Sequence, residues 1–224
     1  KRLREWDFLA AKRPDLYIAN SGNVATRIKK YYKIDSKVVY PPVDIKKFKL
    51  TTGNNGYFLI VSTLTPYKKI DLAVSLFNKI GKKLVIIGDG PHKKYLQSIS
   101  ADNIEFLGFR PDSDVSSYME GCRALIFPGE EDFGIVPLEA MACGKPVLAY
   151  GKGGALETVI PGETGELFYD DNIQSMEDAL AKLLNNEKKY KSPHIRKHAE
   201  SFNRDIFEKN IKKEIAFVNQ QICC

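Results

Sequence analysis

The sequence has few of the residues that build metal centres and disulfide frameworks. Its 224 residues include only four cysteines and three histidines. Neither metal-ligand spacing nor a secreted disulfide pattern occurs among the cysteines, which are Cys122, Cys143, Cys223 and Cys224. We expect Cys122 and Cys143 to be buried thiols because their neighbours are apolar, and we assign no role to the terminal pair. This cysteine usage favours a reducing compartment, and the expected location is the cytoplasm.

Long apolar runs and clustered metal ligands are also missing. No apolar run approaches the ~20 residues that a membrane-spanning helix needs. His194 and His198 lie four residues apart on an expected helix and could share a metal ion, but no third ligand lies nearby. No D-x-D triplet is placed to hold a cation. The sequence therefore predicts a protein without a membrane span and a site without a metal.

Basic residues are concentrated in the first part of the chain. Residues 1–50 hold thirteen Lys and Arg against five Asp and Glu, whereas the rest of the chain has a small acidic excess. This segment could contact an anionic membrane surface peripherally, on the inner face, or could be the solvated side of two helices. It lacks the mixture of basic and aromatic residues typical of RNA-binding domains, so nucleic acid is not an expected partner.

From Tyr57 onward, short apolar runs alternate with helical patterns. This alternation predicts an α/β fold with a Rossmann-like, doubly wound parallel sheet covered by helices on both faces. The expected strands are Tyr57–Ser62, Leu84–Ile87, Ile104–Leu107, Ala124–Phe127, Val147–Ala149 and Glu166–Phe168. The expected helices are Ile70–Ile80, His92–Ser100, Ser113–Glu120, Ile135–Cys143, Ala155–Val159 and Ile173–Asn185. Such a sheet binds ligands at the carboxyl ends of its strands.

The two ends of the chain fall outside this alternation. The first fifty residues predict an amphipathic helix over Arg2–Lys12, a buried strand over 16–19, a basic helix through Lys30 and a second strand over 37–40. Pro41-Pro42 then forms a stiff, extended connector. Two helices, through His198 and through Val218, end the chain.

The most informative segment runs from Glu131 to Gly144. Two carboxylates, Glu131 and Glu139, have seven residues between them; the first lies on a loop after a strand and the second on the following helix. Pro137 is tolerated in the first turn of that helix, where its missing N–H needs no partner. A helix N-terminus at the end of a parallel strand binds anions, and acids around it suit the hydroxyl groups of a phosphorylated ligand. This combination describes a nucleotide sugar.

The same segment resembles the E-x7-E motif of retaining glycosyltransferases of family 4, which have the GT-B architecture. Further matches are Pro41-Pro42-Val43-Asp44, Thr65-Pro66-Tyr67-Lys68-Lys69, Gly88-Asp89-Gly90, Phe106-Leu107-Gly108 and Gly153-Gly154. The resemblance covers nearly the whole chain but only the C-terminal half of such an enzyme. It implies that residues 1–45 end the N-terminal acceptor domain and form the hinge. Residues 46–200 would be the nucleotide-sugar-binding domain and residues 201–224 a helix that crosses back to the N-terminal domain.

The resemblance assigns the diphosphate to basic groups after the first strand of the sheet. In the family, a lysine at the position of Lys68 and an arginine five residues earlier grip the diphosphate. Here the earlier position is Thr63, whose hydroxyl cannot supply the charge of a guanidinium. Lys69 or another basic neighbour could compensate. Without the resemblance, Lys68 would be an exposed lysine at a helix start.

The resemblance also assigns roles to the acidic motif. Glu131 would contact sugar hydroxyls near the transferring carbon, and backbone N–H groups of Phe133, Gly134, Ile135 and Val136 would face the sugar and phosphates. Glu139 would accept hydrogen bonds from the ribose, as in dinucleotide-binding folds. Without the rest of the motif, the two acids could be surface residues whose only effect is a favourable interaction with the helix dipole. We expect Asp132 to cap the helix rather than bind hydroxyls.

Two further turns are candidates for donor contact. Gly88-Asp89-Gly90-Pro91 reads as a strand-to-helix turn with its proline in the first helical turn, but Lys93 stands where a dinucleotide fingerprint needs its last glycine. The family places this turn beside the donor, with Gly88 in contact. Arg110 either stacks on the base or is merely exposed. Gly153-Gly154 permits close approach of the backbone to a ligand, or forms a tight turn.

The resulting hypothesis is a glycosyltransferase that transfers a hexose with retention. The donor is expected to be GDP-mannose, bound without a metal or other cofactor, because the Glu131-Asp132-Phe133-Gly134 variant looks like bacterial mannosyltransferases of surface-polysaccharide synthesis. The expected partners are the nucleotide sugar, a polysaccharide or lipid-linked glycan acceptor, and the N-terminal domain, without which this part would be inactive. The alternatives are a binding module without turnover, which Thr63 favours, and a GT-B-like nucleotide-sugar epimerase. A dinucleotide-dependent dehydrogenase is more remote.

Overall fold

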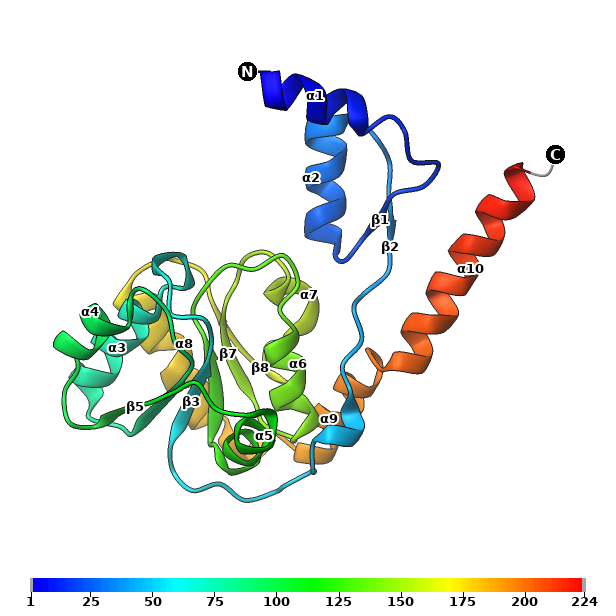
Figure 1. The fold of residues 1–224 in the computed structure, drawn as a ribbon. Helices are drawn as coiled ribbons and strands as arrows, with labels where there is room; N and C mark the ends of the chain where they lie inside the picture. The colour runs from blue at the N-terminus through cyan, green and yellow to red at the C-terminus, as the bar shows by residue number, and fades with distance from the viewer. Residues whose placement is uncertain (1, 223–224) are drawn as a thin grey trace.

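The computed structural model describes residues 2–222, and a six-stranded parallel sheet forms its centre (Figure 1). The strands lie in the order β5-β4-β3-β6-β7-β8, and every neighbouring pair is parallel. Their bounds are β3 (Phe58–Val61), β4 (Leu84–Ile87), β5 (Ile104–Gly108), β6 (Ala124–Phe127), β7 (Val147–Tyr150) and β8 (Gly165–Phe168). The winding direction reverses between β3 and β6, which opens a crevice at their carboxyl ends. The predicted fold class is confirmed.

Helices cover both faces of this sheet. One face carries α3 (Ile70–Ile80), α4 (Lys93–Ser98) and α8 (Ile173–Asn185), and the other carries α5 (Asp112–Gly121), α6 (Ile135–Ala142), α7 (Ala155–Thr158) and α9 (Ser192–Glu200). The four central strands β3, β4, β6 and β7 are apolar throughout because both of their faces are buried, whereas the edge strands β5 and β8 each contain a glutamate. Phe58 of β3 meets Phe77 of α3 edge-to-face at 5.1 Å, within one continuous core. Single-turn helices η1 (Ile45–Lys47), η2 (Pro66–Lys68) and η3 (Glu187–Lys189) lie in the connections.

The sheet and the helices that cover it, from β3 to α9, are called the sheet domain below. The N-terminal segment stands apart from this sheet domain in Figure 1. It consists of α1 (Arg2–Ala10), β1 (Ile18–Ala19), α2 (Gly22–Tyr32) and β2 (Lys37–Val38), with β1 and β2 paired in parallel. No residue of α1 or α2 is buried. The prediction of a buried strand over 16–19 is wrong in extent, because only two residues are extended and Ile18 is exposed. Four apolar residues cannot be buried where so little chain packs around them.

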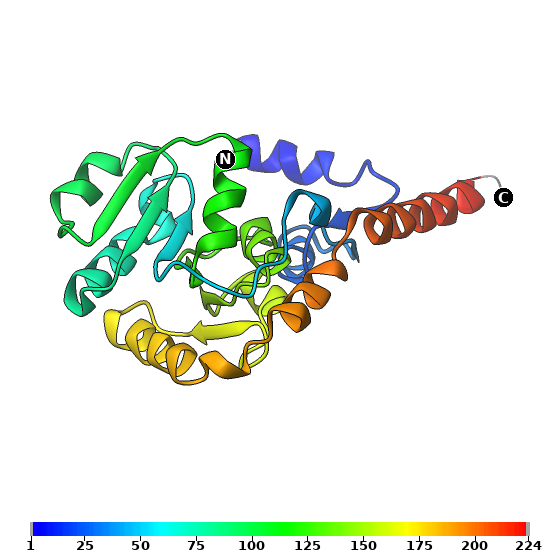
Figure 2. The same ribbon diagram turned by 90° about the horizontal axis from the view of Figure 1, so that it is seen from below.

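The last helix, α10 (Arg204–Ile222), projects from the body of the molecule (Figure 2). It starts beside the connector from the N-terminal segment, where Val43 and Asn203 form a parallel bridge. In Figure 1 it rises on the same side of the sheet domain as β1 and β2. The predicted domain boundaries at residues 45 and 200 stay a prediction. None of the described helices has the length and apolarity needed to cross a membrane.

Side chains from the sheet domain bind the N-terminal segment directly. The Glu157 carboxylate on α7 accepts hydrogen bonds from the backbone N–H groups of Gly22 and Asn23, at 2.8 and 2.9 Å, at the start of α2. Arg27 of α2 forms an ion pair with Asp132. A carboxylate at a helix N-terminus is favourable because it meets unpaired N–H groups and the positive end of the helix dipole. These contacts hold α2 beside the loop that carries Glu131.

Two helix starts differ from the sequence expectation. Asp132 does not cap α6: the residue before the helix is Gly134, no side chain caps it, and Asp132 pairs with Arg27 instead. Pro91 lies outside α4, which begins at Lys93. In both cases a short glycine-containing turn separates the strand from its helix. Cys122 and Cys143 are buried free thiols as predicted, while Cys223 and Cys224 lie outside the described residues.

Candidate functional site

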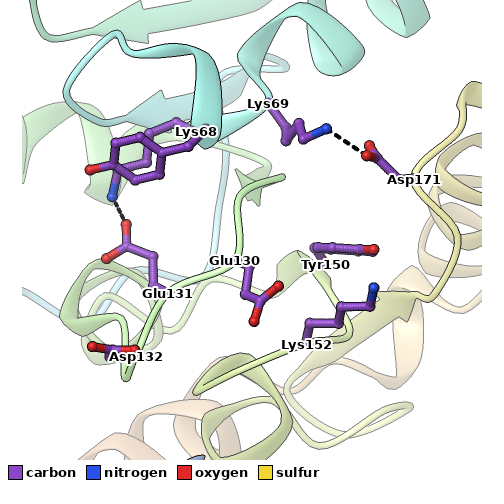
Figure 3. A pocket seen from close by; sticks show the side chains of 9 residues that line it. Lys68, Lys69, Glu130, Glu131, Asp132, Tyr150, Lys152 and Asp171 are labelled. Atoms are coloured by element: carbon purple, nitrogen blue, oxygen red, sulfur yellow. Dashed lines mark hydrogen bonds and ion pairs between the residues drawn. The ribbon is translucent and has the colours of Figure 1, made fainter. Parts of the chain in front are cut away.

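Three cavities lie along the carboxyl edge of the sheet. The first, the Glu139 cavity, measures about 450 Å³ and lies between the ends of β3, β4 and α5. The second, the Glu131 cavity, measures about 400 Å³ and is lined by the residues from Glu131 to Val136 together with Thr63 and Lys68. The third, the Tyr150 cavity, measures about 620 Å³ and lies on the side of β7 (Figure 3). All three fall within the size range of small-molecule sites.

The loop after β6 carries Glu131, and close backbone packing fixes its position. Gly153 and Glu131 form a parallel bridge, and the N–H of Gly154 donates to the carbonyl of Glu131 at 2.8 Å. A Cβ on Gly154 would collide with the backbone of Phe133, and a Cβ on Gly153 would collide with the Glu131 carbonyl. The two glycines are therefore required to hold the Glu131 loop, whether or not they also approach a ligand.

Lys68 and Glu131 meet at the wall between the second and third cavities. The Lys68 ammonium forms an ion pair with the Glu131 carboxylate, and both side chains are largely buried. Lys68 comes from η2 after β3, and Gly129 lets the two loops touch, since a Cβ there would lie 2.9 Å from the Cα of Lys68. The structure thus brings together the two residues predicted to hold the diphosphate and the sugar.

Lys69 does not take the place of the arginine that Thr63 replaces. Its ammonium lies 2.5 Å from the Asp171 carboxylate and lines the Tyr150 cavity (Figure 3). The hydrogen bond to Asp171 raises the pKa of Lys69. Thr63 is exposed and lines the Glu139 and Glu131 cavities, where it adds a hydroxyl but no charge. Lys68 is the one cation that lines the Glu131 cavity among the residues described.

Glu139 occupies a very different environment. It lies on α6, half-buried against the apolar wall of its cavity. Burial raises the pKa of Glu139, the nearby Asp112 carboxylate raises it further, and Lys47 partly opposes both. A carboxylate held in such a place, without an ion pair of its own among the described residues, is available to accept hydrogen bonds from a ligand.

The other predicted contacts also reach these cavities. Gly88 and Arg110 line the Glu139 cavity. A Cβ on Gly88 would collide with the carbonyl oxygen of Ser62, so strand packing alone demands this glycine. Phe133, Gly134, Ile135 and Val136 line the Glu131 cavity at the start of α6. The Phe133 ring is buried and stacks on Tyr40 at 5.5 Å, so only its backbone is placed to meet a ligand.

Several lining residues were not predicted from the sequence. Asn20 and Pro41, from the N-terminal segment, line the Glu131 cavity and show that it lies where the two parts of the chain meet. Lys47 and Asp112 approach each other to 3.7 Å beside the Glu139 cavity. Asp112 follows the end of β5, and the strand-end rule could have found it. Asn20 and Pro41 carry no such signal.

The histidines take structural positions. His194 pairs with Glu163 at 3.1 Å, and His198 contacts the carbonyl of Thr158 at 2.8 Å. Across residues 2–222, no group of three or more potential metal ligands gathers. The two histidines therefore contact different partners, and the structure does not place them to share one metal ion.

Comparison with known proteins gives a consistent picture. The family described as glycosyl transferases group 1 matches residues 43–199. An uncharacterised glycosyltransferase of Methanocaldococcus jannaschii is 31% identical over 183 residues, which cover 80% of this chain and 52% of that protein. A GDP-mannose-dependent α-(1-6)-phosphatidylinositol monomannoside mannosyltransferase of Mycolicibacterium smegmatis is 28% identical, with 59% of this chain and 39% of that protein covered.

Solved structures agree on the fold. Anabaena HepE in complex with UDP-glucose superposes with a TM-score of 0.81 at 24% identity, covering 95% of this chain and 67% of that one. Sucrose-phosphate synthase of Thermosynechococcus elongatus gives 0.85 at 19% identity, covering 97% and 62%. The chain spans about half the length, or less, of the curated relatives that it matches.

Proposed function

The chain belongs to the glycosyl transferases group 1, and on that premise we propose that it binds a nucleotide sugar, GDP-mannose, and transfers mannose with retention to a glycan acceptor. The acceptor would be a polysaccharide or a lipid-linked glycan. The observation that carries this proposal is the pairing of Lys68 with Glu131 on the wall of a cavity next to the one that contains Glu139. Ribose and base would occupy the Glu139 cavity, and diphosphate and sugar the Glu131 cavity.

In the proposed transfer, Lys68, the N-terminus of α6 and Glu131 have different roles. Breaking the bond between the sugar and the diphosphate leaves negative charge on the departing nucleotide, and the Lys68 ammonium would neutralise it. The N-terminus of α6 would add backbone N–H groups and the positive end of a helix dipole. Glu131 would orient the sugar through its hydroxyl groups. We expect no metal or other cofactor to take part.

The choice of donor has support from the named relatives. Several of them, at about 30% identity, are mannosyltransferases that are named as GDP-mannose-dependent. Other structures of the same fold hold UDP or UDP-glucose. Base preference is therefore the first part of the proposal to test.

Calorimetric titration of the chain with GDP-mannose, UDP-glucose, UDP-GlcNAc and ADP-glucose provides that test. We expect GDP-mannose to bind, with an affinity that Glu139→Ala and Lys68→Ala both reduce and that chelation of divalent metals by EDTA leaves unchanged. Glu163→Ala, which removes a surface acid paired with His194, is the matched control. Preference for another donor would overturn the choice of mannose.

Binding without turnover is the second candidate, and Thr63 is the observation that favours it. A threonine in place of a cation leaves Lys68 as the one positive side chain of the Glu131 cavity among the described residues. Release of GDP from GDP-mannose by a protein that also contains the expected N-terminal domain, with a glycan acceptor present, distinguishes the two candidates. Donor binding with no GDP release, and no recovery of release in Thr63→Arg, would favour a binding module.

A further inference from the structure

The Tyr150 cavity has no role in the nucleotide-sugar site described so far. It shares Lys68, Glu131 and Asp132 with the Glu131 cavity and shares no lining residue with the Glu139 cavity. The three cavities therefore form a row, and the Glu131 cavity is the middle one. If the base, ribose, diphosphate and sugar of the donor fill the first two, whatever fills the third lies next to the transferring sugar.

The lining of the Tyr150 cavity combines aromatic rings with polar groups. Tyr67 is exposed, and Tyr150 lies at the buried end, where its ring packs against Phe168 at 5.2 Å. Lys68 approaches the ring of Tyr67 to 5.0 Å, and Lys152 approaches that of Tyr150 to 5.1 Å. Aromatic rings offer a flat apolar surface beside hydrogen-bonding groups, which matches the apolar faces and hydroxyl groups of a pyranose.

The charges of the cavity do not favour an anionic occupant. Three ammonium groups face four carboxylates, and two of the ammoniums are already engaged: Lys68 with Glu131, and Lys69 with Asp171. Figure 3 shows these two pairs on opposite sides of the hollow. Asp132 is paired with Arg27, so among the described residues that line the cavity only Lys152 and Glu130 are left without an ion pair, and their charges balance. These lining residues therefore include no cluster of unpaired cations that would hold a phosphate group.

Glu130 remains available within this arrangement. It is exposed, and its carboxylate makes no hydrogen bond or ion pair with another side chain in the described part of the chain. Figure 3 shows the Glu130 carboxylate between the Glu131 side of the cavity and Tyr150. A carboxylate accepts hydrogen bonds from two or more hydroxyl groups at once, so Glu130 is suited to a neutral, hydroxyl-rich ligand.

We propose that the Tyr150 cavity binds a neutral sugar unit of the acceptor glycan, stacked on Tyr67 and held by the Glu130 carboxylate. The inference rests on the proposed function, because the donor sugar in the middle cavity is what makes the third cavity an acceptor position. It assigns part of acceptor recognition to the sheet domain, at the ends of β3, β6 and β7.

Ligand-observed saturation-transfer NMR on the 224-residue chain tests this inference without any turnover. The probes are α-1,3-linked mannobiose and maltose, each titrated alone, and inorganic phosphate is then added as a competitor. We expect at least one disaccharide to bind in the millimolar range and phosphate not to displace it. Glu130→Ala should weaken disaccharide binding about tenfold, as expected for a lost hydrogen bond to a charged group.

Two further variants distinguish stacking from a general effect on the fold. Tyr67→Ala is expected to weaken disaccharide binding by a similar factor, while Tyr67→Phe, which keeps the ring, retains it. Both Tyr67 and Glu130 are exposed, and thermal unfolding confirms that the variants fold. Glu163→Ala, on another surface, should behave as the unchanged protein.

The results separate the two proposals. Equal disaccharide affinity in the unchanged chain, Glu130→Ala and Tyr67→Ala would overturn the inference, as would displacement by phosphate or no disaccharide binding. If GDP-mannose binds in that last case, the proposed function stands without this acceptor position. If a disaccharide binds in the expected manner but no nucleotide sugar does, the proposed function fails and the cavity is a carbohydrate site of another kind.

Discussion

The Glu139 cavity and the Glu131 cavity contain acids from one motif, but the environments of the two carboxylates are opposite. Glu139 lies against an apolar wall, and burial raises its pKa. Glu131 is held by the Lys68 ammonium in an ionic cluster. A half-buried acceptor without an ion partner is suited to bind a neutral hydroxyl pair, whereas a paired acid beside a cation is suited to a place where charge develops. The comparison predicts that Glu139 acts mainly on donor affinity and Glu131 mainly on turnover.

Replacement of Lys68 by alanine should give the largest effect on turnover. The variant removes the one cation that lines the Glu131 cavity among the described residues. Loss of a group aimed at developing charge typically costs a factor of ~10²–10³ in rate. Steady-state release of GDP from GDP-mannose, with a glycan acceptor present, measures it; this assay and the rate assays below use a protein that also contains the expected N-terminal domain. A loss of less than tenfold would remove Lys68 from the chemistry.

Glu131→Gln should lower turnover by about a hundredfold while leaving nucleotide affinity almost unchanged. The amide preserves the shape of the side chain but removes the charge that orients Lys68 and accepts sugar hydroxyls. Parallel titrations with GDP-mannose and GDP measure affinity, and GDP release measures rate. If the variant lost affinity for GDP as strongly as turnover, the contrast between the two cavities would be broken.

Glu139→Ala should show the reverse pattern. The variant loses the carboxylate that would accept hydrogen bonds from the ribose hydroxyls. Donor binding should weaken about tenfold or somewhat more, as for other hydrogen bonds to charged groups. The turnover of the saturated enzyme should change little. The matched probe is a 2′-deoxy analogue of the nucleotide, whose binding should be less sensitive to the substitution than that of the ribonucleotide. Equal sensitivity of both ligands would argue against a ribose contact.

Thr63→Arg should strengthen donor binding by several-fold, because it places a guanidinium beside the cavity that Lys68 serves alone. Thr63 is exposed, so the longer side chain has room. Parallel titrations with GDP-mannose and with GDP locate the gain in affinity. An equal gain for both ligands places it at the diphosphate, which both contain. Thr63→Gln, which adds length without charge, is the control, and an equal gain there would rule out an electrostatic cause.

The smallest expected effect is on stability. Because burial raises the pKa of Glu139, its ionised form costs free energy of folding at neutral pH, and this cost disappears as the pH falls below the ordinary pKa of a glutamate. Glu139→Gln should therefore raise the melting temperature at pH 7 by a few degrees, and the gain should vanish near pH 4. Thermal unfolding without ligand at the two pH values measures it. A gain that is independent of pH would point to packing instead.

The sheet domain was predictable from local patterns, but the N-terminal segment was not. Each central strand is an unbroken apolar run next to a glycine, a proline or a polar turn, and β4 and β6 match their predicted bounds. By contrast, the short strand β1 lies in a segment with few neighbours, where an apolar pattern does not guarantee burial. The partner of Asp132 was missed for a related reason, since Arg27 lies 105 residues away and a helix cap was the nearest local use of the acid.

By itself, the sequence determined the doubly wound sheet, the placement of the two motif glutamates on a loop and its following helix, and the absence of a cation at position 63. All of these depend on residues close together in the chain. The tertiary structure decided that Lys68 faces Glu131, that Lys69 turns away to Asp171, and that Asn20, Pro41 and Tyr150 adjoin the site. Such choices among charged partners depend on which loops the sheet brings together, and no local spacing encodes that geometry.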